Sequence, residues 1–96
     1  MIIQIKDNIV IEAIRLEEYT DFRNHFVEEC GWSEYDFTQI EDYDWFCVEI
    51  KATNQDLNSN SAYLGTSCAE SFEKFIKRDL DGYKDQLISE AIEGLE

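Results

Sequence analysis

The chain has no proline, only four glycines and no cysteine pair in a CxxC spacing. No linker or low-complexity segment divides it, so residues 1–96 are expected to form a single domain with one modest core. Cys30, Cys47 and Cys68 are odd in number and scattered along the chain. That distribution argues against a disulfide framework and against a zinc site. Each cysteine is expected to behave as a small buried hydrophobe.

Long hydrophobic runs are also absent. No apolar stretch approaches the ~18 residues that a membrane-spanning helix needs. The N-terminal segment, residues 1–6, lacks the basic start and long apolar core of a signal peptide. Apolar residues make up 44% of the chain and aromatic residues 14%, which is too rich for a disordered protein. The sequence therefore predicts a soluble cytoplasmic protein without a membrane partner.

Basic residues are scarce, since eight lysines and arginines face 22 acids and leave a formal net charge of −14. Such a chain repels nucleic acid and anionic membranes, because phosphate binders need the opposite sign. The partner that this charge predicts is cationic, either a basic protein surface or metal ions. A halophile-like or merely soluble surface is the alternative interpretation.

The sequence contains no phosphate-binding glycine loop, no G-x-S-x-G and no H-E-x-x-H. His25 is the only histidine, and a Cys–His nucleophile is available in principle, but no pattern marks a cysteine as activated. Residues 54–60 alternate oxygen ligands as a calcium loop does, yet they lack its central glycine and its final glutamate. A hairpin loop is therefore favoured there. We expect a protein that is not an enzyme and that has no cofactor, no catalytic residues and no metal site.

The first half of the chain changes its apolar period from strand-like to helix-like. Residues 1–5 and 8–14 are rich in β-branched residues and predict a hairpin or two short strands. From Leu16 to Cys30, apolar residues recur at helical spacing, and Gly31 is a natural stop. Ser33 resembles a helix cap, so a short helical turn is predicted over residues 34–40.

The second half predicts two strands followed by two helices. Residues 44–53 form the best strand, and residues 61–67 return as its partner. Ser67 with Glu70 fits a capping box that starts a helix, and a last helix is predicted over residues 81–96. The order β-β-α-(α)-β-β-α-α predicts an α+β fold, with an antiparallel sheet of about four strands and helices on one face.

The acids are expected to gather on one surface. On a wheel of about 100° per residue, the acids of the predicted helix over residues 16–30 share one exposed face, with Arg15 and Arg23 pointing elsewhere. The acid-rich segment that follows would extend this surface. The predicted partner-binding residues are Glu17, Glu18, Asp21, Glu28, Glu29, Glu34, Asp36, Glu41, Asp42, Asp44, Tyr35 and Tyr43.

A surface of this kind offers carboxylates to arginine forks and aromatic faces to cations. DNA presents one charge per ~3.4 Å along each strand, and carboxylates on a helix and an adjoining loop can approximate that density. The aromatic residues between the acids would then anchor the segment to the core or to the partner. The alternative is a wholly buried aromatic set with acids merely exposed between its members.

The chain resembles phage-encoded DNA-mimic inhibitors of the anti-CRISPR, anti-restriction and uracil-glycosylase-inhibitor types. It shares their small size, their strong negative charge, their lack of catalytic motifs and a plan of a sheet with an acidic helix. The resemblance covers general character over the whole chain and transfers no residue. It implies a monomer or homodimer in the host cytoplasm that blocks the DNA site of a nuclease or CRISPR effector without binding nucleic acid itself. Two alternatives stay open: an immunity protein or antitoxin against a basic nuclease toxin, and an adaptor that dimerises through Trp32 and Tyr35.

Overall fold

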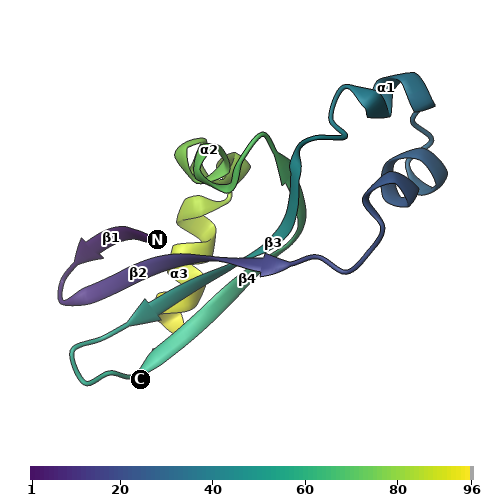
Figure 1. Cartoon of the computed structure of the whole chain (residues 1–96). Coiled ribbons are helices and arrows are strands. Elements are labelled where there is room, and N and C mark those ends of the chain that lie inside the picture. The colour runs from purple at the N-terminus through teal and green to yellow at the C-terminus, as the bar shows by residue number, and fades with distance from the viewer. Residues whose placement is uncertain (96) are drawn as a thin grey trace.

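A computed structural model of the chain describes residues 1–95 and contains one four-stranded antiparallel sheet. The strands β1 (Ile2–Lys6), β2 (Ile9–Glu17), β3 (Asp44–Thr53) and β4 (Ser59–Ala69) lie in the order β1-β2-β3-β4. Each strand pairs with the next along the chain (Figure 1). The predicted α+β class and the four-stranded antiparallel sheet are confirmed.

The helical segments fall into two groups. The helices α2 (Phe72–Lys77) and α3 (Lys84–Glu93), joined by the turn η2 (Asp79–Gly82), cover one face of the sheet (Figure 1). The π-helical segment η1 (Asn24–Glu29) and the helix α1 (Glu34–Thr38) lie in the connection between β2 and β3. That connection projects beyond the end of the sheet, and the molecule measures 50 × 20 × 19 Å.

The hydrophobic core lies between the sheet and its two covering helices. In β3, every second residue from Phe46 to Ala52 is buried, because alternate side chains of a strand point to the same face. These side chains meet Leu87, Ile88 and Ala91 from α3. The remaining buried members of the core cluster are Ile11, Ala13, Ala62, Ala69, Phe75, Ile76 and Leu80.

The predicted N-terminal hairpin is confirmed, with a two-residue turn at Asp7 and Asn8. Lys6 pairs with Ile9 across this turn. Both turn residues have positive φ, 53° and 64°, as the turn type that matches the twist of paired strands requires. Aspartate and asparagine tolerate this conformation better than other residues with side chains.

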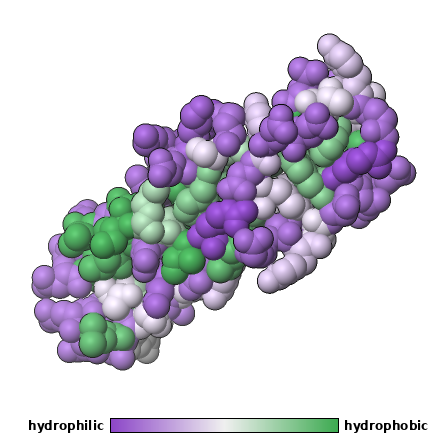
Figure 2. Space-filling view, viewed as in Figure 1, coloured by the Kyte–Doolittle hydropathy of each residue, from purple (hydrophilic) through white to green (hydrophobic). Residues whose placement is uncertain are grey.

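The other face of the sheet carries no covering helix from residues 1–95 (Figure 1). Ile2, Ile5 and Tyr63 lie on this face, with 60%, 68% and 64% of their surface exposed. Figure 2 shows strongly hydrophobic side chains gathered at the end of the molecule that carries β1 and β2. The opposite end, formed by the projecting connection, is mostly hydrophilic in the same view.

The predicted helix over residues 16–30 is wrong in its first part. β2 continues to Glu17, with Leu16 paired with Cys47 and Glu17 paired with Phe46. Helical turns begin only at Phe22, and Tyr19, predicted on the apolar face, is 92% exposed. Pairing with β3 provides ladder hydrogen bonds and burial, and this tertiary context overrides the helical spacing of the apolar residues.

The predicted capping box at Ser67 is also wrong. Ser67 lies inside β4, and its hydroxyl donates to the carbonyl of Gly65 at 2.8 Å. The cap of α2 is Ser71, whose Oγ accepts a hydrogen bond from the Lys74 amide at 3.1 Å. β4 runs on to Ala69 because Ser67, Cys68 and Ala69 still pair with β3, so the helix starts later. The last helix begins at Lys84, and Glu96 lies outside the described residues.

The turn η2 has an unusual backbone. Asp79, Leu80 and Asp81 have φ values of 57°, 55° and 56°, and Gly82 follows at 90°. The left-handed region costs residues with a Cβ roughly 1–2 kcal/mol each, and glycine much less. Leu80 is fully buried in this conformation, so burial of its side chain offsets part of the backbone strain.

Replacing Asp81 with glycine is expected to stabilise the protein by about 0.5–1 kcal/mol, because strain at φ 56° is relieved at an exposed position. The change in the free energy of unfolding is measured by urea unfolding, with circular dichroism as the probe. The matched control is Asp85→Gly, which makes the same exchange in the first turn of α3. It should destabilise the protein by about 1 kcal/mol. Equal losses in both variants would contradict the prediction.

Candidate functional site

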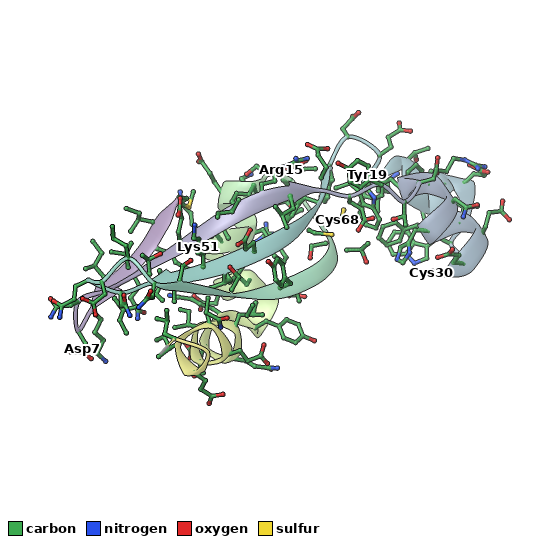
Figure 3. The ribbon with its side chains drawn as sticks, turned by 90° about the horizontal axis from the view of Figure 1, so that it is seen from below. Asp7, Arg15, Tyr19, Cys30, Lys51 and Cys68 are labelled. Carbon is green, nitrogen blue, oxygen red and sulfur yellow. The ribbon has the colours of Figure 1, made fainter. Side chains whose placement is uncertain are left out.

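We name residues 18–43, the connection between β2 and β3, the acidic lobe. It contains eight acidic residues and one arginine. Half of the formal net charge of −14 therefore falls in little more than a quarter of the chain. The lobe stands off the end of the sheet, and side chains project from it into solvent (Figure 3). This share of the negative charge is carried by one projecting segment.

Aromatic side chains form a small core that holds the lobe to the sheet. The Phe22 ring stacks on Trp45 of β3, with a centroid distance of 4.8 Å and an interplanar angle of 19°. Phe22 also meets Phe37 edge to face at 5.1 Å, and Phe37 is buried. The indole Nε1 of Trp45 donates to the Thr20 carbonyl at 3.0 Å. The sequence left two alternatives open: aromatic residues that anchor the segment to the core or to a partner, and a wholly buried aromatic set. Neither describes this cluster fully, because some aromatic residues are buried in it while others remain exposed.

Short-range hydrogen bonds define the two helical segments of the lobe. The Asp21 carboxylate accepts from the Asn24 amide at 2.7 Å, which caps the start of the first segment. Gly31 has φ 76°, and the Trp32 amide reaches back to the Phe26 carbonyl at 2.9 Å. Ser33 caps α1 through the Asp36 amide at 3.1 Å. The predicted stop at Gly31 and the predicted cap at Ser33 are confirmed.

Arg15 forms ion pairs with Glu17 and Asp44 at the base of the lobe, where the lobe joins β2 and β3. Its Nε and Nη2 atoms donate to the two carboxylate oxygens of Asp44 at 2.9 and 2.7 Å, and its Nη1 donates to Glu17 at 2.8 Å. These bonds keep the pKa of the guanidinium above its ordinary value and hold the pKa of Asp44 below its own. The expectation that Arg15 points away from the acids is wrong. Glu17 and Asp44 are partly neutralised within the chain.

Arg23 is likewise paired, contrary to the sequence prediction. Its guanidinium forms an ion pair with Glu34, in which Nε lies 3.2 Å from Oε2. This contact joins the first helical segment of the lobe to α1. The two errors have different physical reasons. Arg15 and Glu17 lie in the strand β2, where residues two apart share a face. Arg23 meets Glu34 because the chain folds back between these two residues.

Glu18 faces Cys47 of β3 rather than the outer face of a helix. Its carboxylate accepts hydrogen bonds from the Thr20 amide at 3.0 Å, from the Thr20 hydroxyl at 2.8 Å and from the Cys47 thiol at 3.1 Å. Chiefly because of the Thr20 amide, the pKa of Glu18 lies below its ordinary value. Burial and then Glu18 raise the pKa of Cys47 to about 11, so this thiol stays protonated at neutral pH.

The structure brings most of the predicted partner-binding residues together on the lobe and leaves Glu17 and Asp44 at its base. Glu29 lies beside His25, with 3.3 Å between Oε2 and Nδ1. Tyr35 is 75% exposed and Tyr43 is half-buried. Within residues 1–95, six of the predicted acids make no ion pair. Glu18 and Asp21 accept hydrogen bonds within the chain. In this part of the chain, the carboxylates of the other four make neither kind of contact: Glu28, Asp36, Glu41 and Asp42.

A hollow of about 440 Å³ opens on the lobe surface between Gly31, Trp32, Asp36, Gln39 and Ile40. Trp32 is 38% exposed, and its ring packs on Phe26 at 4.6 Å. An aromatic ring beside a carboxylate without an ion pair suits the side chain of a lysine or an arginine. Asp36 is one of the partner-binding residues predicted from the sequence, but no sequence pattern indicated the hollow.

Comparison with protein-family models, with curated proteins and with solved structures gives no match for this chain. No helix among residues 1–95 is long and apolar enough to cross a membrane. In the same part of the chain, no group of three or more His, Cys, Asp and Glu side chains is placed to hold a metal ion. The function must therefore be argued from the lobe itself.

Proposed function

We propose that this protein is a non-enzymatic inhibitor that inserts its acidic lobe into a cationic nucleic-acid-binding groove of another protein and so blocks that groove. The observation that carries the proposal is the concentration of half the net charge on one projecting lobe. A partner built to bind nucleic acid, such as a nuclease or a CRISPR effector, presents the complementary charge. The protein itself does not bind nucleic acid, which it repels.

The contacts within the lobe and between the lobe and β3 support this role. Association costs free energy when mobile side chains and loops must be ordered at the interface. In the lobe, the Phe22–Trp45 stack and the Arg23–Glu34 pair hold the backbone before a partner arrives. The acids are thus displayed on an organised scaffold, and less ordering remains to oppose binding.

The four lobe acids whose carboxylates make neither an ion pair nor a hydrogen bond within residues 1–95 offer the sharpest test of the proposal. Glu28, Asp36, Glu41 and Asp42 are exposed, so their reversal to lysine should leave the fold intact. The matched control reverses four exposed acids of α2 and α3, namely Glu73, Asp85, Glu90 and Glu93. Both variants change the net charge equally, and only the first changes the lobe.

The wild-type protein is immobilised on beads and incubated with host lysate. It is expected to retain a basic partner, which added duplex DNA should displace from the beads. The lobe variant should bind the purified partner roughly 100-fold more weakly, because several close charge pairs are lost. The control variant should stay within a few-fold of the wild type. Wild-type affinity should fall steeply with salt, since exposed charges are screened over about 10 Å at 0.1 M. Equal retention by the lobe variant, or a partner that DNA does not displace, would refute the proposal.

A further inference from the structure

A π-helical turn brings three reactive side chains of the lobe together. In η1, the Cys30 amide donates to the carbonyl of His25, five residues earlier, at 3.0 Å. In an α-helix, a residue five positions on would be turned by roughly 140° from His25. The wider π turn instead places Cys30 next to His25, and Glu29 also stays within reach. Such turns occur often at functional sites.

The His25 ring bridges the other two side chains through its two nitrogens. Nδ1 lies 3.3 Å from the Glu29 carboxylate, and Nε2 lies 3.7 Å from the Cys30 sulfur. An ionised carboxylate can only accept a hydrogen bond, so a neutral ring carries its proton on Nδ1. Nε2 then holds the lone pair that faces the thiol. The rings of Phe26 and Trp45, at 5.1 and 5.3 Å, hold the imidazole in this orientation.

Cys30 differs from the other two thiols of the protein in its surroundings. It is exposed, whereas Cys47 and Cys68 are half-buried. Burial is the main cause that raises the pKa of Cys47 and of Cys68 to about 11. Figure 3 labels Cys30 on the lobe and Cys68 in the sheet. A disulfide in solution therefore reaches Cys30 directly, and only Cys30 has an imidazole nitrogen beside its sulfur.

We propose that Cys30 is a site of thiol–disulfide exchange, with His25 as its general base and Glu29 as the residue that positions His25. Nε2 of His25 takes the proton of the Cys30 thiol as Sγ attacks one sulfur of a small disulfide. The disulfide bond breaks, a mixed disulfide forms on Cys30, and the leaving thiolate takes the proton back from the imidazolium. One disulfide and one thiol are consumed and one of each is formed, so no further oxidant is needed.

The test measures the reaction of the folded protein with dithiodipyridine, an uncharged aromatic disulfide, and peptide mass spectrometry identifies the modified cysteine. Cys30 is expected to react first. His25→Asn should slow its modification about tenfold at neutral pH, less than the ~100-fold or more of enclosed active sites because Cys30 is exposed. The difference should narrow at alkaline pH, where the thiol ionises without help. Equal rates at neutral pH, or preferred reaction of Cys47 or Cys68, would overturn the proposal.

Comparing Glu29→Gln with Glu28→Gln separates two effects on Cys30: the positioning of His25 by Glu29, and the electrostatic effect of the negative charge around the thiol. Both remove one negative charge from the same exposed helical segment, but only Glu29 contacts His25. Removing a nearby negative charge by itself favours the thiolate and speeds the reaction. Loss of the carboxylate that fixes the ring should instead slow it severalfold. Glu29→Gln is therefore expected to be slower than the wild type and Glu28→Gln equal or faster. A faster Glu29→Gln variant would refute the positioning role.

Discussion

The Phe46→Ala variant is expected to lose about 3–5 kcal/mol of stability. Phe46 has no exposed surface, and its ring meets Phe72 and Phe75 edge to face at 5.4 and 5.3 Å. Its removal deletes buried apolar surface and leaves a cavity that β3 and α2 cannot both close. A chain of 96 residues has roughly 5–14 kcal/mol of stability in total. The variant should therefore lose a large fraction of its total stability and unfold at a much lower urea concentration than the wild type.

Urea unfolding at low temperature, followed by circular dichroism, measures this loss. The control is Tyr63→Ala, which also removes an aromatic ring from the β3–β4 pair of strands. Tyr63 lies on the uncovered face and is 64% exposed, so its replacement should cost about 1 kcal/mol or less. A loss below about 1.5 kcal/mol for Phe46→Ala would show that the core does not depend on this ring.

The bounds of β3 could be predicted from the sequence, whereas the end of β2 could not. In β3, Phe46, Val48 and Ile50 alternate with less buried residues, and this local pattern is enough to predict a strand with one buried face. At Leu16 and Glu17, the same residues fit a strand or the start of a helix. Pairing with Cys47 and Phe46 decides between them, and that contact is remote in sequence.

The acidic composition of the lobe is visible in the sequence, but its internal pairs are not. Arg15 and Asp44 are separated by 29 positions, and no local pattern predicts their contact. The arrangement around His25 depends on a π-helical turn, for which the sequence offers no recognised signal. A Cys–His pair could therefore be proposed from composition, while the choice of Cys30 over Cys47 and Cys68 required the structure.

The Trp45→Ala variant is expected to release the acidic lobe while the sheet stays folded. Trp45 supplies the aromatic contact between β3 and the lobe, through its stack on Phe22, and it also donates a hydrogen bond to the Thr20 carbonyl. It also contacts Phe26 at 5.9 Å. Phe37 is the one buried side chain of the lobe, so the lobe has little core of its own to replace these contacts.

Hydrogen exchange of backbone amides tests this directly. Loss of a large aromatic contact costs about 3 kcal/mol, so amides of residues 22–40 should exchange roughly 100-fold faster. The amides that pair β3 with β4 should keep their protection. Tyr35→Ala, at a position that is 75% exposed, should change neither region. A uniform loss of protection in the Trp45 variant would instead show that the lobe and the sheet unfold as one unit.

The Trp45→Ala variant also shows how much of the binding affinity depends on the charge of the lobe and how much on its folded structure. Trp45→Ala removes no acid, so the long-range attraction to a cationic partner remains. If an organised display of carboxylates is required, affinity should still fall by one to two orders of magnitude, because the partner must then order the released segment. Association rates, which depend mainly on charge, should change little, and dissociation should become faster. Calorimetry and surface plasmon resonance on the purified partner measure these quantities. Unchanged affinity would mean that the charge of the lobe suffices without its fold.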